Sequence, residues 1–228
     1  MMAVCEPLEI LKEYVNELYE VRLGKTPERV DLQQTSFGFV LRFEGYLTHI
    51  EKTVLVQKGP KFVKELREIS MLEISSEIKK WCEENSLDKV DAVLDDWNYF
   101  QDTGCILVKT NDWKRNKIIS LIPLNFIDEV RAISSKEFNR PLEEEWVQVN
   151  DSISLLQQKG FLLPFDRTMV DKGLEHLLYD RECNVRGEIQ KHKRMLEESC
   201  NREIADIFLN FNYEKDVVTF IFFFINNE

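Results

Sequence analysis

Apolar and polar residues along this chain follow two periods, one typical of helices and one of strands. In residues 6–23, Leu8, Leu11, Val15 and Leu18 recur at helical spacing, which predicts an amphipathic helix that ends at Gly24. Residues 30–34 and 37–43 alternate apolar and polar side chains instead, which predicts two strands. Residues 34–36 are the expected hairpin connection between them.

Two helices and two more strands are predicted next. Thr48-His-Ile-Glu51 has the form of a capping box, in which a threonine hydroxyl and a glutamate carboxylate cap a helix start, here one that runs to about residue 57. Residues 58–60, Lys-Gly-Pro, break it, and a long helix is expected over 61–85. Its core-facing side chains are expected to be Phe62, Leu66, Ile69, Ile74, Ile78 and Trp81. Strands follow at 89–97 and 105–109, with residues 101–104 as their turn.

The second half of the chain repeats the first at an offset of 114–115 residues. The matched pairs include Gly45 with Gly160, Leu47 with Leu162, Glu51 with Asp166, Lys52 with Arg167 and Thr53 with Thr168. The second half predicts helices at 125–138, 164–178 and 182–199 and strands at 144–150, 153–159, 204–213 and 217–225. The predicted fold class is therefore α+β, with two pseudo-equivalent αββααββ repeats that form an intramolecular pseudo-dimer. The expected boundaries are 1–110 for the first repeat, 111–122 for a junction and 123–228 for the second, diverged repeat.

The capping box differs between the two repeats. Where the first has Thr48 and Glu51, the second has Leu163-Pro164-Phe165-Asp166, so the capping hydroxyl is lost. Proline suits the first helical position, and a carboxylate still lies near the positive end of the helix. This change preserves the helix start, which favours a structural role for the motif.

The C-terminal strand, Val217–Ile225, is apolar on both faces. Phe220, Phe222 and Phe224 should point one way, and Ile221, Phe223 and Ile225 the other. Such a strand needs cover on both sides, and we expect the opposite repeat or another subunit to supply part of it. A homo-oligomer formed through this strand is a further expectation. Nine residues are too few to cross a bilayer as a helix.

Composition narrows the class of protein. The chain has 228 residues and a net charge of −11, which works against nucleic acid or anionic lipid as a bulk partner. Its five cysteines are spread singly, which suits a reducing compartment. The N-terminus lacks the pattern of a signal peptide, so a cytoplasmic location is expected, without a transmembrane segment.

Reactive patterns are scarce. The three histidines have no metal-site spacing, and no phosphate-binding or nucleophile motif is present. Asp95 and Asp96 are adjacent, so on a strand they point apart and cannot act as a pair; a solvated strand end is expected. The basic clusters 114–117 and 191–194 indicate solvated faces or contact with an acidic partner. We therefore predict no catalytic, cofactor-binding or metal-binding residue and no cofactor.

Several stretches of the first half resemble a known family. They are "LKEYVNELYEVRLGKTPERVD", "FVLRFEGYLTHIEK" and "DDWNYFQDTGCILVKT". They are similar to the MpsC family, the soluble component of a Na⁺-translocating, membrane-potential-generating system, formerly a domain of unknown function. The resemblance covers about residues 6–110 and is weak in the second half. The motif residues that carry it are Gly24, Pro27, Val40, Arg42, Gly45, Leu47, Thr48, Glu51, Lys52, Thr103 and Gly104.

The resemblance implies an accessory role beside membrane-associated protein subunits of the same system. One such subunit looks like an antiporter-type ion conductor, and the other resembles a zinc-containing carbonic anhydrase. Together they imply a link to inorganic carbon (bicarbonate or CO₂) uptake. We expect a non-enzymatic accessory or regulatory component, located in the cytoplasm or held at the inner face of the membrane through protein partners. The alternatives are a small-molecule sensor with a ligand site between the repeats and an enzyme of unrecognised type.

Overall fold

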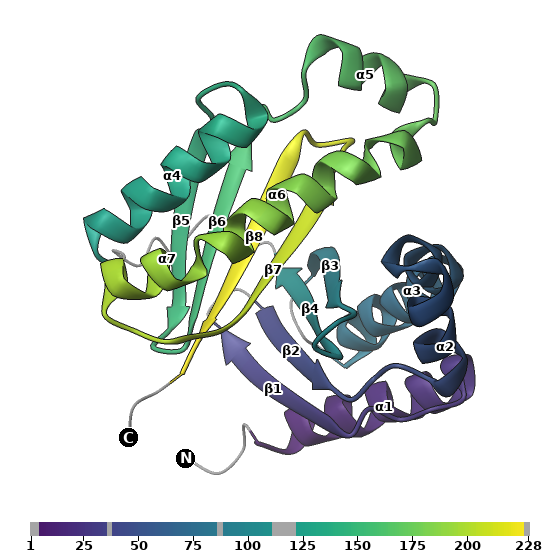
Figure 1. Ribbon diagram of the computed structural model, residues 1–228. Helices are drawn as coiled ribbons and strands as arrows, with labels where there is room; N and C mark the ends of the chain where they lie inside the picture. Colours follow the sequence, from purple (N-terminus) through teal and green to yellow (C-terminus); the bar gives the residue numbers. More distant parts are fainter. Residues whose placement is uncertain (1–4, 36–37, 86–88, 111–121, 226–228) are drawn as a thin grey trace. The chain divides into compact units, whose positions relative to one another are not determined.

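The computed structural model describes residues 5–35, 38–85, 89–110 and 122–225, and the chain forms two compact units, Met1–Asn116 and Lys117–Glu228 (Figure 1). The boundary between the units falls within the segment expected to be a junction. Most of that segment, residues 111–121, lies outside the described residues.

The first unit has the predicted element order. It consists of α1 (Cys5–Leu23), β1 (Arg29–Thr35), β2 (Gly38–Glu44), α2 (His49–Lys58), α3 (Pro60–Glu84), β3 (Val90–Asn98) and β4 (Thr103–Thr110). The four strands form an antiparallel sheet in the order β1-β2-β4-β3. Helix α1 ends as expected, because Gly24 adopts a φ of 71° and its N–H donates to the Glu20 carbonyl at 2.9 Å. The predicted hairpin connection extends to Ser36, which lies outside the described residues.

The second unit repeats this order with one α-helix and one 3₁₀ helix more. It consists of α4 (Leu124–Phe138), β5 (Glu143–Asn150), β6 (Ile153–Lys159), α5 (Pro164–Asp171), the 3₁₀ helix η2 (Glu175–Leu178), α6 (Tyr179–Lys191), α7 (Lys193–Cys200), β7 (Ile204–Asn212) and β8 (Val217–Phe224). Its sheet is antiparallel in the order β5-β6-β8-β7, which is the order of the first sheet. The α+β fold class with repeated units is therefore confirmed. The intramolecular pseudo-dimer stays a prediction.

The backbone repeats in detail as well. Gly24 and Asn139 both follow the first helix of their unit with a positive φ, 71° and 53°. Asp102 and Asp216 both precede the last strand with φ values of 54° and 52°. These pairs have the sequence offsets of 115 and 114 that the repeat predicts. Positive φ is uncommon outside glycine, so its recurrence at matched places supports the repeat.

In each unit, the helices pack against one face of the sheet. In the first, α1 and α3 cover Phe39, Leu41, Phe43, Ile106 and Val108. In the second, α4, α6 and α7 cover Leu156, Leu209, Phe220, Phe222 and Phe224. Ile221 and Phe223 point to the other face of β8 and are buried too, so the predicted two-sided burial is confirmed for β8. Ile225, expected on the same face, lies beyond the end of β8 and is 40% exposed. What covers the second face stays a prediction.

The expected core face of α3 is partly wrong. Ile74 and Ile78 are buried and Trp81 is half-buried, but Phe62, Leu66 and Ile69 are exposed. The buried residues of α3 are Val63, Arg67, Met71, Ile74, Ile78 and Cys82. An arginine lies in the middle of this buried stripe, so the apolar pattern alone points to the wrong side of the first three turns.

Three smaller expectations need correction. The helix predicted over 164–178 stops at Asp171, because Gly173 takes a φ of 69°, and the helix predicted over 182–199 is interrupted at His192, where no glycine or proline marks a break. Thr103 and Gly104 are the first residues of β4 rather than part of a turn.

Asp95 and Asp96 do point to opposite faces of the sheet, as predicted, but they do not form a solvated strand end. Asp96 is only 8% exposed. Asp95 accepts a hydrogen bond from the indole of Trp97 at 2.6 Å, so this side chain is part of the folded interior.

Candidate functional site

Most of the sequence motif gathers where β2 passes into α2. Gly45 has a φ of 64°, and its N–H donates to the Asp102 carbonyl at 2.8 Å. A Cβ atom at this position would lie 2.3 Å from the side chain of Glu28. The backbone conformation therefore favours glycine here, whereas the exposed end of the Glu28 side chain could move aside.

The expected capping box is present at the start of α2. The N–H of Glu51 donates to Thr48 Oγ1 at 3.2 Å, and the Thr48 N–H donates to Glu51 Oε2 at 2.8 Å. The Thr48 hydroxyl also donates to Glu51 Oε2 at 2.8 Å. Glu51 is therefore largely buried and satisfies the helix start with one of its two carboxylate oxygens.

The other oxygen of Glu51 binds a buried arginine from α3. Arg67 Nη1 donates to Glu51 Oε1 at 2.7 Å, and Arg67 is only 1% exposed. Its guanidinium carbon lies 4.5 Å from the ring centroid of Tyr46 and 4.8 Å from that of Trp97. Burial alone would lower the pKa of this guanidinium, but Tyr19 and Glu51 outweigh that effect and hold the pKa above its ordinary value. Ion pairing and the two ring faces thus stabilise a charge that would be costly to bury alone.

Asp102, in the turn before β4, ties the loop from the other side. Its carboxylate accepts from the Leu47 N–H at 2.8 Å and forms an ion pair with Lys52 Nζ at 2.8 Å. The hydrogen bond with Asp102 raises the pKa of Lys52. Lys25, between the motif residues Gly24 and Pro27, donates to the Leu47 carbonyl at 3.0 Å. Four segments distant in sequence therefore meet at one loop.

We name this group of side chains and backbone the α2 clasp. It comprises Lys25, Gly45, Tyr46, Leu47, Thr48, Glu51, Lys52, Arg67 and Asp102.

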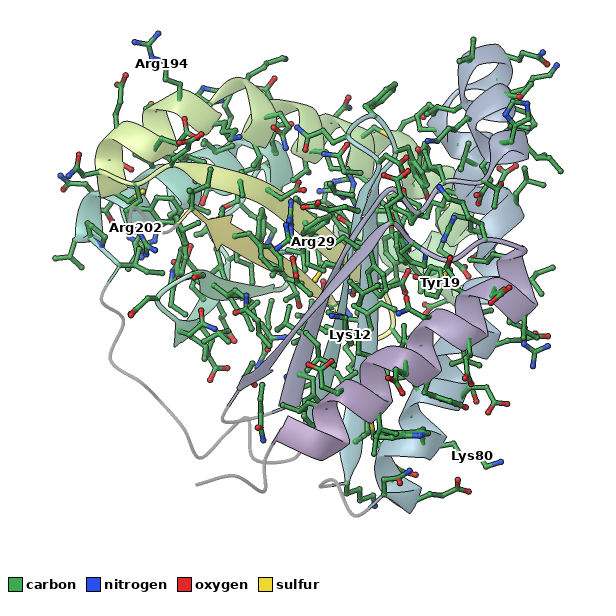
Figure 2. All side chains as sticks on the ribbon, turned by 90° about the horizontal axis from the view of Figure 1, so that it is seen from below. Lys12, Tyr19, Arg29, Lys80, Arg194 and Arg202 are labelled. Atoms are coloured by element: carbon green, nitrogen blue, oxygen red, sulfur yellow. The ribbon has the colours of Figure 1, made fainter. Side chains whose placement is uncertain are left out.

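The aromatic floor of the clasp explains another motif residue. The ring of Trp97 lies 4.6 Å from that of Tyr46, and a Cβ atom on Gly104 would come within 2.1 Å of the Trp97 ring. Glycine at 104 therefore lets the indole lie flat on β4. Tyr19, on α1 (Figure 2), stacks on Phe43 with 5.1 Å between the ring centroids and closes the cluster.

Comparison with known families bears on this unit. A family model described as Na⁺-translocating membrane potential-generating system (MpsC) matches residues 8–112. The match contains every residue of the α2 clasp and all seven helices and strands of the first unit, apart from the first turn of α1. The first unit is therefore similar to the MpsC family, and we call it the MpsC unit. No curated protein and no solved structure gives a significant match to the chain.

The second unit carries a counterpart of the clasp found in the MpsC unit. The Leu162 N–H donates to the Asp216 carboxylate at 2.8 Å, and Arg167 pairs with the same carboxylate. Asp166 accepts from the Leu163 N–H at 2.8 Å and pairs with Arg181. These hydrogen bonds and ion pairs are therefore kept in the second unit although the capping hydroxyl is lost. In both units an arginine–carboxylate pair holds the start of the helix that follows the second strand.

The remaining motif residues lie near the clasp but outside it. Pro27 is buried, Arg42 pairs with Glu44 on the helix-free face of the sheet, and Thr103 is buried at the start of β4. Four clasp residues are not among the predicted motif residues: Lys25, Tyr46, Arg67 and Asp102. The repeat could have found the last two, because their counterparts Arg181 and Asp216 lie at the same offset of 114.

The arrangement is suited to holding the fold together. Burial raises the pKa of Tyr19 and of Tyr46, so both phenols keep their protons near neutral pH. Burial also raises the pKa of the Cys82 thiol to about 12, which leaves it unreactive. Among the described residues, no group of three His, Cys, Asp or Glu side chains could hold a metal ion. The geometry of the α2 clasp therefore favours a structural role for the motif.

A surface depression in the second unit is lined by Arg194, Glu197, Glu198, Asn201, Arg202 and Glu203. Arg194 is exposed (Figure 2), and the guanidinium carbon of Arg202 lies 4.4 Å from the ring centroid of Phe224. Of the helices in the described part of the chain, none combines the length and apolarity needed to cross a bilayer.

Proposed function

We propose that this protein is a non-enzymatic accessory or regulatory component of a bacterial Na⁺-translocating, membrane-potential-generating system linked to inorganic carbon uptake. The family match over residues 8–112 is the observation that carries the proposal, because it covers the whole folded core of the first unit. Under this proposal the chain works in the cytoplasm, at the inner face of the membrane, through protein partners.

The chemistry of the motif supports an accessory role over a catalytic one. The clasp carboxylates are each engaged: Glu51 by Arg67 and the start of α2, and Asp102 by Lys52 and the Leu47 N–H. A general acid or base must reach a substrate, and these groups are already bound to the protein. We infer that the motif holds the first unit in its fold, and that activity belongs to the partners.

Co-purification tests this proposal. The affinity-tagged chain is isolated from native membranes in mild detergent, and the proteins that accompany it are identified by mass spectrometry. We expect an antiporter-type membrane subunit to be enriched over a control with the tag alone. Recovery of no membrane subunit above that control would contradict the proposal.

A further inference from the structure

Helix α3 carries a second apolar stripe on the side opposite to its buried one. Phe62, Leu66, Ile69 and Leu72 are 49%, 54%, 73% and 68% exposed. Their spacing of four, three and three residues keeps them on one side of a helix that turns about 100° per residue. The core-facing residues Val63, Arg67 and Met71 lie on the other side. We name these four exposed residues the α3 stripe.

The fold itself does not require this stripe. At the offset of 114 that relates Arg67 to Arg181, the second unit has His176, Asp180, Cys183 and Arg186 in place of the α3 stripe. All four are more polar than their counterparts, although the second unit has the same strand order and a similar clasp. The stripe is therefore particular to the MpsC unit. Grouped exposed apolar residues of this kind mark interaction sites.

The charged residues beside the α3 stripe indicate which kind of partner fits it. Glu65 and Glu68 are exposed along one border of the stripe, with Lys61 at its N-terminal end. A second copy packed antiparallel along the stripe would bring Glu65 beside Glu68 of its partner, which is unfavourable. An anionic lipid surface would be repelled by these carboxylates and by the net charge of −11. A helix with lysine or arginine beside its apolar face complements the stripe.

We propose that the α3 stripe docks a basic amphipathic helix of a partner protein. The apolar side chains of the two helices would pack in register, and the basic residues of the partner would lie beside Glu65 and Glu68. The cytoplasmic ends of membrane subunits are rich in lysine and arginine. The assignment of the docked helix to a membrane subunit rests on the proposed function. The docking surface and its preference for a basic helix are independent of that function.

A peptide-binding experiment tests the surface by itself. The probe is a fluorescent 18-residue amphipathic helix of leucine and lysine, compared with a scrambled peptide of the same composition. We expect Leu66→Ser/Ile69→Ser and, separately, Glu65→Lys/Glu68→Lys to weaken binding of the amphipathic probe at least tenfold. The matched control is Val21→Ser, which changes an apolar residue on α1 that is 78% exposed. It should bind like the wild type, and all variants should keep the wild-type melting temperature.

Other results would overturn the proposal. Equal binding of both peptides, or equal binding by every variant, would mean that bulk charge alone attracts the probe. No binding to the wild type would also contradict it. A dimer, or binding to anionic vesicles, that is lost in Leu66→Ser/Ile69→Ser would assign the stripe to a second copy or to lipid instead. Failure of the proposed function would show separately, as absence of membrane subunits in the co-purification.

Discussion

The pair of Arg67 and Glu51 offers the sharpest test of how the first unit is held together. Glu51→Ala removes the partner of a guanidinium that is 1% exposed, and it removes the acceptor used by the Thr48 N–H. Arg67 then keeps the faces of Tyr46 and Trp97. Its Nε and Nη2 atoms have no hydrogen-bond partner among the described residues, so no hydrogen bond at these atoms replaces the lost ion pair.

The expected loss is large. Leaving a buried charge without its partner costs about 3–5 kcal/mol, and losing a helix cap adds about 1 kcal/mol. Arg67→Met should cost less, because Glu51 would still accept hydrogen bonds from the N–H and hydroxyl of Thr48. Since folded domains are stable by about 5–15 kcal/mol, Glu51→Ala should remove a sizeable part of the stability of the first unit.

Urea unfolding of the full chain measures these effects, with Glu17→Ala, an exposed glutamate on α1, as the matched control. The double variant Glu51→Ala/Arg67→Met should lose less stability than the two single variants lose together, because the two residues form one interaction. A change below about 1 kcal/mol for Glu51→Ala, or full additivity, would refute the account of a buried ion pair.

Four further predictions concern stability. Thr48→Ala should cost about 0.5–2 kcal/mol in urea unfolding and leave partner binding unchanged; a fully stable variant without partner binding would instead make Thr48 functional. Gly104→Ala should cost about 1–3 kcal/mol, because its Cβ would meet the Trp97 ring, and a wild-type melting temperature would contradict this. Burial raises the pKa of Asp95, so the folded state binds its proton more tightly than the unfolded chain and loses stability as pH rises from 3.8 through that pKa. Asp95→Asn should therefore gain stability relative to the wild type as the pH rises above 3.8, and a difference in urea midpoint that does not change with pH would rule this out. Deleting residues 217–228 should cause aggregation, because each buried phenylalanine contributes about 1.5–3 kcal/mol, whereas a monomeric, cooperatively melting truncation would show that β8 is dispensable.

The periodic parts of the sequence predict the structure well. Alternation along Phe39, Leu41 and Phe43 gives β2 its core face, and the capping box marks the start of α2 to the residue. The repeat predicts that the two sheets share one strand order, and they do. Alternation and capping depend on residues that are close together in the sequence, so a local sequence pattern is enough to predict them.

The first turns of α3 and the clasp depend on distant partners instead. Arg67 is buried because Glu51 and two aromatic rings from other elements surround it, and no local pattern shows that. Because the buried side of α3 includes an arginine, the opposite side is the more apolar one in the first turns. The apolar pattern therefore predicts that this exposed side faces the core. Asp102 was missed for the same reason, since its partners Leu47 and Lys52 lie 50 or more residues away.

The membrane potential of living cells tests the central claim most directly. A strain that lacks this protein is compared with strains that carry the wild type, Leu66→Ser/Ile69→Ser or Val21→Ser, with a potential-sensitive dye in Na⁺-containing medium. We predict a lower potential without the protein, restored by the wild type and by Val21→Ser but not by the stripe variant. A potential that does not change when the protein is absent would contradict its assignment to a membrane-potential-generating system.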